Sequence, residues 1–397
     1  MKVLKFGGSS VATVQKIQEI AAYLKKRAKN EKIVVVVSAM GKMTNQLIAL
    51  AHEISEHPNQ RELDRLLSIG EQQTIALLAM ALCEQGVPTL SLTGYQVGIL
   101  TTGYHTKSTI KKVETTVLLD SLEKNDVVIV AGFQGINYMN DITTLGRGGS
   151  DTTAVALAAA LKCDCEIYTD VDGVYTTDPR LYPNAKKINE ISYYEMMEMA
   201  SLGSKIMEPR SVELGQKYNV KIYVGKTLSD TKGTYIMSQE FISEEKVISA
   251  ASVNDKVIQV RITQIGKQSS TVAHIFKVMS DHHVNVDMIS HHVSVHGSRI
   301  EFTCNQDEEV FLAEALKELK EELPEMKVNL DTHVAKVSVV GIGMRNAVGV
   351  AASVFGILEE NNIEFRQVTT SEISISFIID LDDSKKAVTA ICEAFDL

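Results

Sequence analysis

Short, almost continuous apolar runs alternate with longer amphipathic stretches through about the first 235 residues of the chain. The apolar runs are KVLKF, KIVVVVSAM, VPTLSLTG, DVVIVAGF and CEIYTD. Strands with this pattern are buried on both faces, which is typical of a parallel or mostly parallel sheet. The stretches between them have a helical pattern at Val14–Asn30, Asn45–Ile54, Gly70–Gln85 and Thr152–Leu161. This alternation predicts an α/β fold, an αβα sandwich that binds its ligands at the carboxyl ends of the strands.

The pattern changes near Ser238–Lys246, where the polar segment SQEFISEEK suits a linker. Two similar units follow, each with the order strand, helix, strand, strand, helix. In the first unit the strands are KVIQVRITQ, NVDMISHHV, SRIEFTC and a closing KVNL, and the helices are Ser269–His282 and Glu308–Glu322. In the second unit the strands are AKVSVVGIG, IEFRQVTT and ISISFII, and the helices are Ala347–Asn361 and Asp383–Phe395.

The second unit lacks a closing strand, whereas an unpaired strand, VISAASV at Val247–Val253, precedes the first unit. One surplus strand and one missing strand match each other. We therefore expect Val247–Val253 to complete the second unit, so that each unit becomes a ferredoxin-like βαββαβ module of the α+β class.

Composition and charge narrow the range of functions. The 397 residues suffice for two or three domains. A formal net charge of -10 argues against nucleic acid or an acidic membrane surface as the main partner, and no continuous apolar run approaches the length of a membrane span. Five scattered cysteines make no disulfide framework, and the chain opens on a strand rather than on a signal peptide. We therefore expect a reduced, cytoplasmic protein.

The first candidate site is the turn KFGGSS, which ends the first predicted strand. Gly7 and Gly8 let backbone N–H groups approach a ligand closely, and the following helix offers its positive amino terminus. Lys5 adds a mobile positive charge suited to phosphate oxygens. An ordinary strand–turn–helix connection capped by serine explains the turn equally well. The chain contains neither a Walker A loop nor the protein-kinase signatures.

Two further polar clusters lie at strand or helix ends. In LGRGGSDTTA, Arg147 could hold a carboxylate in a bidentate fork. Ser150, Asp151 and Thr152 in the same cluster would cap the next helix, whatever else they do. The third cluster, YTDVDGVYTTDPR at Tyr168–Arg180, would be unremarkable as a solvated loop. It follows a buried strand, however, and this is where an α/β sheet binds ligands.

Seven motifs follow one another in a fixed order: KFGGSS, VVVVSAMGKMTN, SIGE, GFQG, LGRGGSDTTA, YTDVDGVYTTDPR and SLGSKIMEPRSVE. This set resembles the aspartate kinases of the amino-acid-kinase family, and the two C-terminal units resemble the paired ACT regulatory domains of those enzymes. The resemblance covers essentially the whole chain. It implies a catalytic domain at 1–240, a first ACT domain at 255–331, and a second at 332–397 that the strand at 247–253 completes. No homoserine dehydrogenase segment follows Leu397, so we expect the monofunctional form.

The resemblance also implies an activity. It is the ATP-dependent phosphorylation of the L-aspartate β-carboxylate to 4-phospho-L-aspartate, the first step toward lysine (through diaminopimelate), threonine and methionine. Such a transfer depends on positioning and charge stabilisation, because a carboxylate nucleophile needs no base at neutral pH. Mg²⁺ would be held mainly by the phosphates of ATP, and no protein ligand is assigned to it.

The same resemblance implies roles for individual residues. The catalytic pair would be Lys5, against the transferring phosphoryl group, and Asp151, which would orient Lys5 rather than remove a proton. The residues that would bind aspartate are Arg147 at its α-carboxylate, Glu71 at its α-ammonium, and Ser38 and Thr44. The residues that would surround ATP are Gly7, Gly8, Ser9, Thr169, Asp170, Tyr175, Asp178, Arg180 and Lys226.

Several of these assignments have a plain structural alternative. Glu71 stands at the start of a predicted helix, where a carboxylate interacts well with the helix dipole in any case. Lys226 could equally be a surface lysine, and Tyr175 could simply pack its loop. The family usually has a histidine where this chain has Glu208, a position that we place outside the core chemistry.

The C-terminal units imply regulation. ACT domains usually pair across subunits and bind an amino-acid effector at the interface, so we expect a homodimer or a dimer of dimers. The turns Gln264–Ser270 and Gly341–Ala347 each lead to a helix amino terminus, which suits an effector carboxylate. The effector stays open between lysine, threonine, diaminopimelate and none. Seven of the ten histidines lie between His274 and His333, but no complete ligand set accompanies them, so we expect no metal site.

Two other functions compete with this one. The first is a sensor of nucleotides or amino acids that has lost catalysis and kept the ACT pair. Lys5, Arg147, Asp151 and Asp170 together disfavour it, because a sensor has no need of a phosphoryl-transfer set. The second is a related kinase that acts on glutamate, N-acetylglutamate or a nucleotide. The ACT pair, together with SIGE and GRGGSD, disfavours that alternative.

Overall fold

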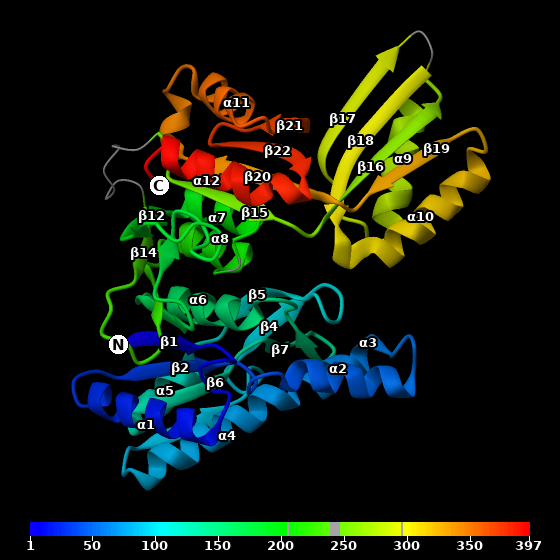
Figure 1. The fold of residues 1–397 in the computed structure, drawn as a ribbon. Coiled ribbons are helices and arrows are strands. Elements are labelled where there is room, and N and C mark those ends of the chain that lie inside the picture. The colour runs from blue at the N-terminus through cyan, green and yellow to red at the C-terminus, as the bar shows by residue number, and fades with distance from the viewer. Residues whose placement is uncertain (205, 239–246, 295–296) are drawn as a thin grey trace. The chain divides into compact units, whose positions relative to one another are not determined.

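The computed structural model describes residues 1–204, 206–238, 247–294 and 297–397. The chain divides into two compact units (Figure 1). The first comprises Met1–Tyr175, Lys187–Ser201 and Lys205–Ser243, and the second comprises Thr176–Lys186, Leu202–Ser204 and Glu244–Leu397. Apart from its first residue, the predicted linker at 238–246 lies outside the described residues, and so does His296 of the histidine-rich stretch.

The first unit is built on an eight-stranded sheet in the order β12-β14-β13-β9-β1-β2-β6-β3. Its strands are β1 (Lys2–Phe6), β2 (Ile33–Val37), β3 (Thr89–Leu92), β6 (Val127–Ala131), β9 (Cys165–Thr169), β12 (Glu190–Ser192), β13 (Ile222–Lys226) and β14 (Thr234–Met237). Neighbouring strands run parallel, except that β13 and β14 are antiparallel. β2 and β6 are buried at every position, because apolar side chains on both faces are covered by helices.

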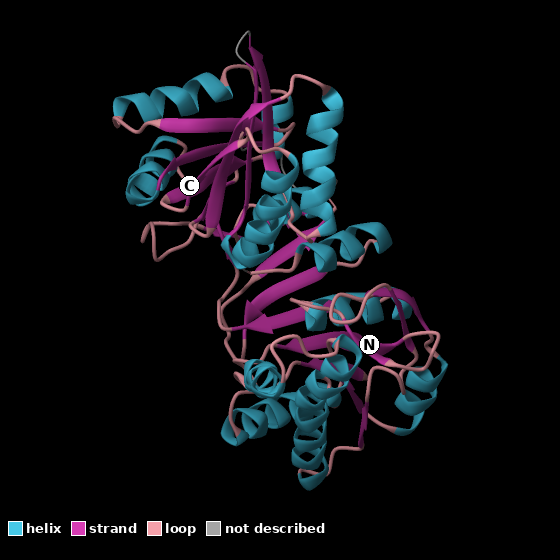
Figure 2. Ribbon diagram, turned by 90° about the vertical axis from the view of Figure 1, so that its right-hand side faces the viewer, coloured by secondary structure: helices cyan, strands magenta, loops and turns pink. Residues whose placement is uncertain are grey.

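Among the described residues, eight helices of the first unit flank its sheets. They are α1 (Val14–Ala28), α2 (Met43–Ile54), α3 (Gln60–Leu67), α4 (Ile69–Glu84), α5 (Thr116–Lys124), α6 (Gly149–Leu161), α7 (Tyr193–Ser201) and α8 (Pro209–Tyr218). α1 and α4 pack on one face of the main sheet, and α6 and α8 lie on the other (Figures 1 and 2). α6 is buried along most of its length, since its small alanine and threonine side chains allow a close approach to β1. The predicted αβα sandwich is confirmed.

A second, smaller sheet of the first unit has the order β5-β4-β7-β8. Its strands are β4 (Ile99–Thr102), β5 (Thr109–Val113), β7 (Gln134–Ile136) and β8 (Ile142–Thr144). The sequence pattern did not predict this sheet, because its strands are only three to five residues long. A short hairpin of β10 (Val174–Tyr175) and β11 (Lys187–Ile188) completes the unit.

The second unit contains two four-stranded antiparallel sheets, in the orders β17-β18-β16-β19 and β15-β20-β22-β21. The first module consists of β16 (Val257–Ile265), α9 (Ser269–Asp281), β17 (Asp287–Ser294), β18 (Gly297–Asn305), η2 (Gln306–Glu308), α10 (Glu309–Glu322) and β19 (Lys327–Asp331). The second consists of β15 (Ala250–Asn254), β20 (Val334–Val340), η3 (Ile342–Arg345), α11 (Val350–Glu360), β21 (Phe365–Thr370), β22 (Ser374–Asp380), η4 (Leu381–Asp383) and α12 (Ser384–Ala394). Each module packs its two helices against its own sheet around a separate apolar core.

The early strand completes the second module, as the surplus and the deficit of strands predicted. β15 pairs antiparallel with β20 over its whole length and forms an edge of that sheet. Several helix boundaries differ from the prediction: α6 begins at Gly149 rather than at Thr152, and α11 begins at Val350 rather than at Ala347. The 3₁₀ turn η3 occupies the preceding residues, and Gly349 has a left-handed φ of 91° that delays the helix.

One helical stretch, Gln60–Glu84, is long and apolar enough to cross a membrane by length and composition alone. It is not a continuous apolar run, because charged residues such as Arg61, Asp64 and Glu71 interrupt it, so it leaves the expectation about unbroken runs unchanged. The stretch comprises α3 and α4, and α4 places Ile75, Leu78 and Leu82 in the core of the first unit. A buried core helix of a globular protein passes the same test.

Candidate active site

The carboxyl ends of four neighbouring strands bring most of the predicted site residues to one edge of the main sheet. β2, β1, β9 and β13 are parallel neighbours, with Phe6 paired to Val37 and to Tyr168. At the next junction Lys226 pairs with Thr169. The four segments that leave these strands are therefore side by side, as expected for the ligand-binding edge of an α/β sheet.

Lys5 and Asp151 form an ion pair at this edge. Lys5 is the next-to-last residue of β1, and Asp151 lies in the first turn of α6. Lys5 Nζ lies 2.5 Å from Asp151 Oδ1, and the two side chains are only 10% and 13% exposed. Asp151 thus fixes the ammonium group of Lys5 close to the amino terminus of α6, and both features favour an anion. This contact agrees with the predicted orienting role of Asp151.

The turn after β1 is packed against the turn after β2. A Cβ on Gly8 would lie 2.9 Å from the Ala39 carbonyl oxygen, so only glycine fits without a shift. The Gly8 carbonyl accepts a hydrogen bond from the Gly41 N–H at 3.0 Å. The Gly7 N–H donates to the Tyr168 carbonyl at 3.2 Å. The prediction that the Gly7 amide faces ATP is therefore corrected: β9 engages it, and the Gly8 amide is the one that finds no backbone acceptor among the described residues.

Two hydroxyl groups that the sequence analysis missed join this turn to the next strand ends. Ser10 Oγ and Thr227 Oγ1 are 2.6 Å apart, and the Thr227 hydroxyl donates to the Thr169 carbonyl at 3.0 Å. Ser10 directly follows the predicted site residue Ser9, which is exposed, and Thr227 directly follows Lys226. Their adjacency to predicted residues was the available signal, but spacing along the chain does not reveal that they meet.

Glu71 reaches the turn after β2 from the start of α4. Its side chain is 3% exposed, and Oε1 accepts a hydrogen bond from the Ala39 N–H at 3.0 Å. Oε2 is buried and has no hydrogen-bond partner among the described residues. Burial raises the pKa of Glu71 to about 8, although two backbone hydrogen bonds oppose the shift. A buried carboxylate with one unpaired oxygen suits a cationic ligand group, which would lower that pKa.

Ser38 and Thr44 lie on either side of the residues that Glu71 contacts. Ser38 directly follows β2, and its N–H donates to the Phe6 carbonyl at 3.2 Å. Thr44 lies in the first turn of α2, just after Gly41, whose φ of 55° lets the chain turn sharply. Both side chains are half-buried. Their hydroxyl groups could therefore complete a polar pocket beside Glu71.

The loop that carries Arg147 is held on both sides. Gly146 and Gly148 have left-handed φ values of 76° and 61°, which give the loop its tight path. The Arg210 guanidinium donates to the Leu145 carbonyl at 2.7 Å and anchors the beginning of the loop. Arg147 itself is exposed between the two glycines. This arrangement presents Arg147 outward from a fixed backbone.

Glu208, which is expected to lie outside the core chemistry, lies beside this loop. A Cβ on Gly148 would come within 2.3 Å of Glu208 Cβ, so the two residues are in direct contact. Burial raises the pKa of Glu208, and the nearby Asp151 carboxylate adds to the shift. Arg210 and Arg147 oppose it. Sequence spacing gave no indication of this contact, since about sixty residues separate the glycine from the glutamate.

The predicted nucleotide residues of the first unit lie at or near the same edge. The Thr169 hydroxyl donates to Asp170 Oδ1 at 3.0 Å, and Asp170 and Lys226 are both exposed. The Tyr175 hydroxyl donates to the Asp172 carboxylate at 3.0 Å, and the pKa of Tyr175 is raised by burial and by that carboxylate. Asp172, which the sequence analysis did not select, therefore anchors Tyr175.

Asp178 and Arg180 are bound to each other. Arg180 Nε lies 3.0 Å from Asp178 Oδ1, and Nη2 lies 2.6 Å from Oδ2. Both residues belong to the second compact unit, in the segment Thr176–Lys186. The structure thus brings them together as a pair.

Within the described residues, the one group of side chains that could hold a metal ion consists of His333, Asp380 and Asp382. His333 Nε2 is 3.6 Å and 3.3 Å from the two carboxylates. This group lies in the second module, on an exposed surface, and not at the strand ends of the first unit.

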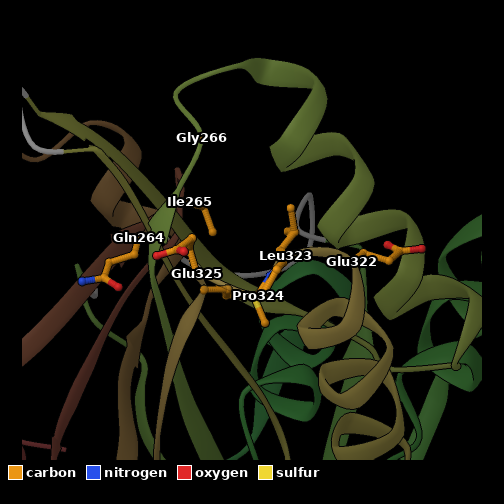
Figure 3. Close-up of a pocket in the computed structure, with 8 residues that line it drawn as sticks. Gln264, Ile265, Gly266, Glu322, Leu323, Pro324 and Glu325 are labelled. Carbon is orange, nitrogen blue, oxygen red and sulfur yellow. The ribbon is translucent and has the colours of Figure 1, made fainter.

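A shallow pocket in the first module lies at the turn that was expected to bind an effector carboxylate. Its walls are Gln264, Ile265, Gly266 and the segment from Glu322 to Met326 (Figure 3). Figure 3 shows the Glu325 carboxylate among the lining side chains and the Glu322 carboxylate directed away from them. The Glu322 carboxylate is paired with the His274 imidazole, and the Glu325 carboxylate disfavours an anionic ligand group at this turn.

Comparisons with known proteins give the family context. The model of the amino acid kinase family matches residues 1–226, and an ACT domain model matches residues 337–395. Aspartokinase 2 of Bacillus subtilis is 43% identical over 397 residues, with 100% of this chain and 97% of that protein covered. An aspartokinase of Pseudomonas aeruginosa is 45% identical over 401 residues with the same coverage. Escherichia coli aspartokinase III, crystallised with aspartate and ADP, has a TM-score of 0.82 at 24% identity with both chains fully covered, so the fold is shared.

Proposed function

The chain belongs to the aspartokinases of the amino acid kinase family, and we propose that it transfers the γ-phosphoryl group of ATP to the β-carboxylate of L-aspartate. The observation that carries this proposal is a pair of complementary features around the ends of β1 and β2. The Lys5–Asp151 pair and the amino terminus of α6 suit phosphate, and the unpaired oxygen of Glu71 suits an amine. The product, 4-phospho-L-aspartate, is the precursor expected for lysine, threonine and methionine synthesis.

Lys5 is the group that stabilises the transferring phosphoryl group. The Lys5 ammonium is nearly buried, so its charge acts in a region of low dielectric. Its attraction to the phosphoryl oxygens therefore increases as negative charge develops on them in the transition state. Asp151 holds the ammonium in place and does not need to accept a proton, because the attacking carboxylate is already ionised at neutral pH. The Gly8 amide and the Ser9 side chain add hydrogen-bond donors on the same turn.

The aspartate substrate is held through its two α-substituents. The α-ammonium completes the hydrogen bonding of Glu71 Oε2, and the α-carboxylate pairs with the exposed guanidinium of Arg147. Ser38 and Thr44 contribute hydroxyl groups from the turn after β2 and the start of α2. These contacts leave the β-carboxylate directed toward Lys5, which is the requirement for in-line transfer.

ATP enters as its Mg²⁺ complex, with the metal held mainly by the phosphate oxygens and water. Thr169, Asp170, Tyr175 and Lys226 form the nucleotide side of the site in the first unit. Thr169, Asp170 and Lys226 lie at the ends of β9 and β13, which supports this role, and Tyr175 lies in the following strand β10. A bound ADP in the related Escherichia coli enzyme supports nucleotide use by this chain.

The ACT modules provide feedback regulation by an amino acid, and the protein assembles as a homodimer or a dimer of dimers. The edge strands β17 and β21 support the assembly, because they expose Ile289, Val293 and Phe365. All five cysteines are free, which suits a cytoplasmic enzyme. Light scattering that finds a monomer, or cell fractionation that finds the protein outside the cytoplasm, would contradict these two assignments.

Acceptor specificity tests the proposed function. ADP release is measured with Mg–ATP and L-aspartate, L-glutamate, N-acetyl-L-glutamate or UMP, and hydroxylamine traps any acyl phosphate as a hydroxamate. We expect ADP release and hydroxamate with L-aspartate alone. Turnover with another acceptor would assign a related kinase, and ATP binding without any turnover would favour a sensor.

A further inference from the structure

A completely buried carboxyl group lies outside the site described above. Asp64, in α3, is 0% exposed, and both of its oxygens accept hydrogen bonds. The Thr106 N–H donates to Oδ1 and Oδ2 at 3.0 and 3.1 Å, and the Thr144 hydroxyl donates to Oδ1. His105 Nδ1 lies 2.6 Å from Oδ2. Burial of an acidic group is costly, so a carboxyl group with this many partners organises the segments that provide them.

Two of these segments lead directly to Arg147. Thr144 is the last residue of β8, three residues before Arg147, and its carbonyl accepts a hydrogen bond from the Ser108 N–H at 3.0 Å. The Thr106 carbonyl is packed against the loop itself, because a Cβ on Gly146 would lie 3.1 Å from it. Thr106 has a left-handed φ of 66°, which the Asp64 hydrogen bonds help to maintain. Asp64 therefore stabilises the Arg147 loop through two residues, Thr144 and Thr106.

The helix that carries Asp64 leads to Glu71. α3 ends at Leu67, and α4 follows directly and contains Glu71 in its first turn. The Ser68 carbonyl, at the junction, accepts a hydrogen bond at 3.0 Å from the buried Gln134 side chain. Gln134 in β7 pairs with Thr144 in β8. The helix junction and the end of β8 are thus connected twice, through Asp64 and through Gln134.

We propose that Asp64 is a positioning residue for L-aspartate: it fixes the separation between Glu71 and Arg147, which hold the two α-substituents of the substrate. The proposal rests on the proposed function, since it assumes that these two residues bind aspartate. Asp64 touches no substrate and acts through the Thr144 hydroxyl and the Thr106 amide. Its loss changes the spacing of the aspartate groups and leaves the Lys5 and nucleotide side intact.

The alternative is that Asp64 only stabilises the fold, and the chain offers a matched control for it. Arg61, on the same helix, donates to Asp141 Oδ1 at 2.6 Å, and Asp141 immediately precedes β8. This ion pair also joins α3 to the β7–β8 hairpin, but at the end of β8 that lies away from Arg147. A role in general attachment of α3 predicts the same effect from both carboxylates, whereas a positioning role predicts an effect from Asp64 alone.

The test uses Thr144→Val, which removes the hydroxyl at nearly constant volume, Thr144→Ser, which restores it, Asp64→Asn, and the control Asp141→Asn. Calorimetry gives the Kd of L-aspartate and of ADP, the hydroxamate assay gives both KM values and kcat, and a thermal scan gives the midpoint of unfolding. We expect Thr144→Val and Asp64→Asn to weaken aspartate binding about tenfold with ADP binding changed less than about twofold, because each loses a hydrogen bond to a buried carboxyl group. Thr144→Ser should recover most of the aspartate affinity.

Equal losses of aspartate and ADP affinity in Thr144→Val would overturn the proposal, as would an equal effect of Asp141→Asn or no recovery in Thr144→Ser. If Asp64→Asn fails to fold, the two Thr144 variants decide the outcome. A wild-type protein that binds aspartate and ADP yet makes no hydroxamate would instead contradict the proposed function. The calorimetric comparison still tests the positioning role in that case.

Discussion

Replacement of Glu71 by glutamine isolates what a buried carboxylate contributes to substrate binding. The side chain is 3% exposed, and burial raises its pKa from 4.5 to about 8. Because the folded pKa lies above the unfolded one, Glu71 costs no stability below pH 4.5, and its cost grows as the pH rises toward 8. A displacement of this size is worth at most about 5 kcal/mol above pH 8. Without ligand, E71Q should therefore be the more stable protein at pH 8 and lose this advantage near pH 5.

Aspartate binding has the opposite requirement, because the substrate ammonium needs the ionised carboxylate. Below pH 8, binding must remove a proton from Glu71, so the wild-type KM for aspartate should fall as the pH rises from about 6 to about 8. E71Q should show a KM raised about 100-fold, without this pH dependence. ADP release at saturating Mg–ATP across this range measures both effects. Glu84→Gln, an exposed position on the same helix, is the control and should keep the wild-type pH profile.

Two results would refute this reasoning. Curves of stability against pH that stay parallel for wild type and E71Q between pH 5 and 8 would show that burial does not raise the pKa of Glu71. An E71Q enzyme with wild-type KM for aspartate would show that the unpaired oxygen does not meet the substrate ammonium. Thermal midpoints without ligand and initial rates with ligand separate these two outcomes.

Two further predictions concern the phosphate turn and the regulatory modules. Gly8→Ala places a Cβ 2.9 Å from the Ala39 carbonyl oxygen, so we expect the KM for ATP to rise about tenfold and the thermal midpoint to fall. In Gly7→Ala the new Cβ would lie 3.5 Å from Lys5 Nζ, an ordinary contact distance, so this variant should raise the KM for ATP less than Gly8→Ala does. A larger effect of Gly7→Ala than of Gly8→Ala would contradict the packing described for this turn. Asn346→Ala, in the turn between β20 and α11, should weaken inhibition by L-lysine or L-threonine about tenfold, with the uninhibited rate unchanged within about twofold. A parallel loss of inhibition and activity would show that this turn does not act separately from catalysis.

Hydrophobic periodicity predicted five strands of the main sheet, β1, β2, β3, β6 and β9, and both C-terminal modules, because these elements have strong patterns; β12, β13 and β14 were not among the predicted apolar runs. β1 has the predicted bounds, Lys2–Phe6, and the count of strands alone assigned β15 to the second module. The small sheet of β4, β5, β7 and β8 was not predicted, since strands of three to five residues carry almost no periodic signal. Mean hydropathy has a different limit. The helical stretch Gln60–Glu84 is apolar and long enough for a membrane span, although α4 packs in the core of the first unit.

The candidate site divides in a similar way. Residues at strand ends could be selected from sequence, because the parallel sheet aligns those ends, and the Lys5–Asp151 contact agrees with that selection. Contacts between distant segments could not be selected in this way. Glu208 against Gly148 and Asp64 beneath the Arg147 loop depend on tertiary packing that has no local pattern. Closeness in sequence does not ensure that two residues belong to the same unit. Asp178 is only three residues from Tyr175 but belongs to the other compact unit.

The most direct test of the central claim compares hydroxamate formation from L-aspartate by the wild type, Lys5→Ala and Lys2→Ala. Lys2→Ala is the control. Lys2 lies at the other end of β1 and its Nζ is 2.7 Å from Glu166, so this variant also loses a lysine ion pair, but away from the strand ends that form the site. We expect Lys5→Ala to lose about a thousandfold or more in kcat while Lys2→Ala stays within a few-fold of the wild type. A Lys5→Ala enzyme that forms hydroxamate at the wild-type rate would contradict the claim that this edge of the sheet performs phosphoryl transfer.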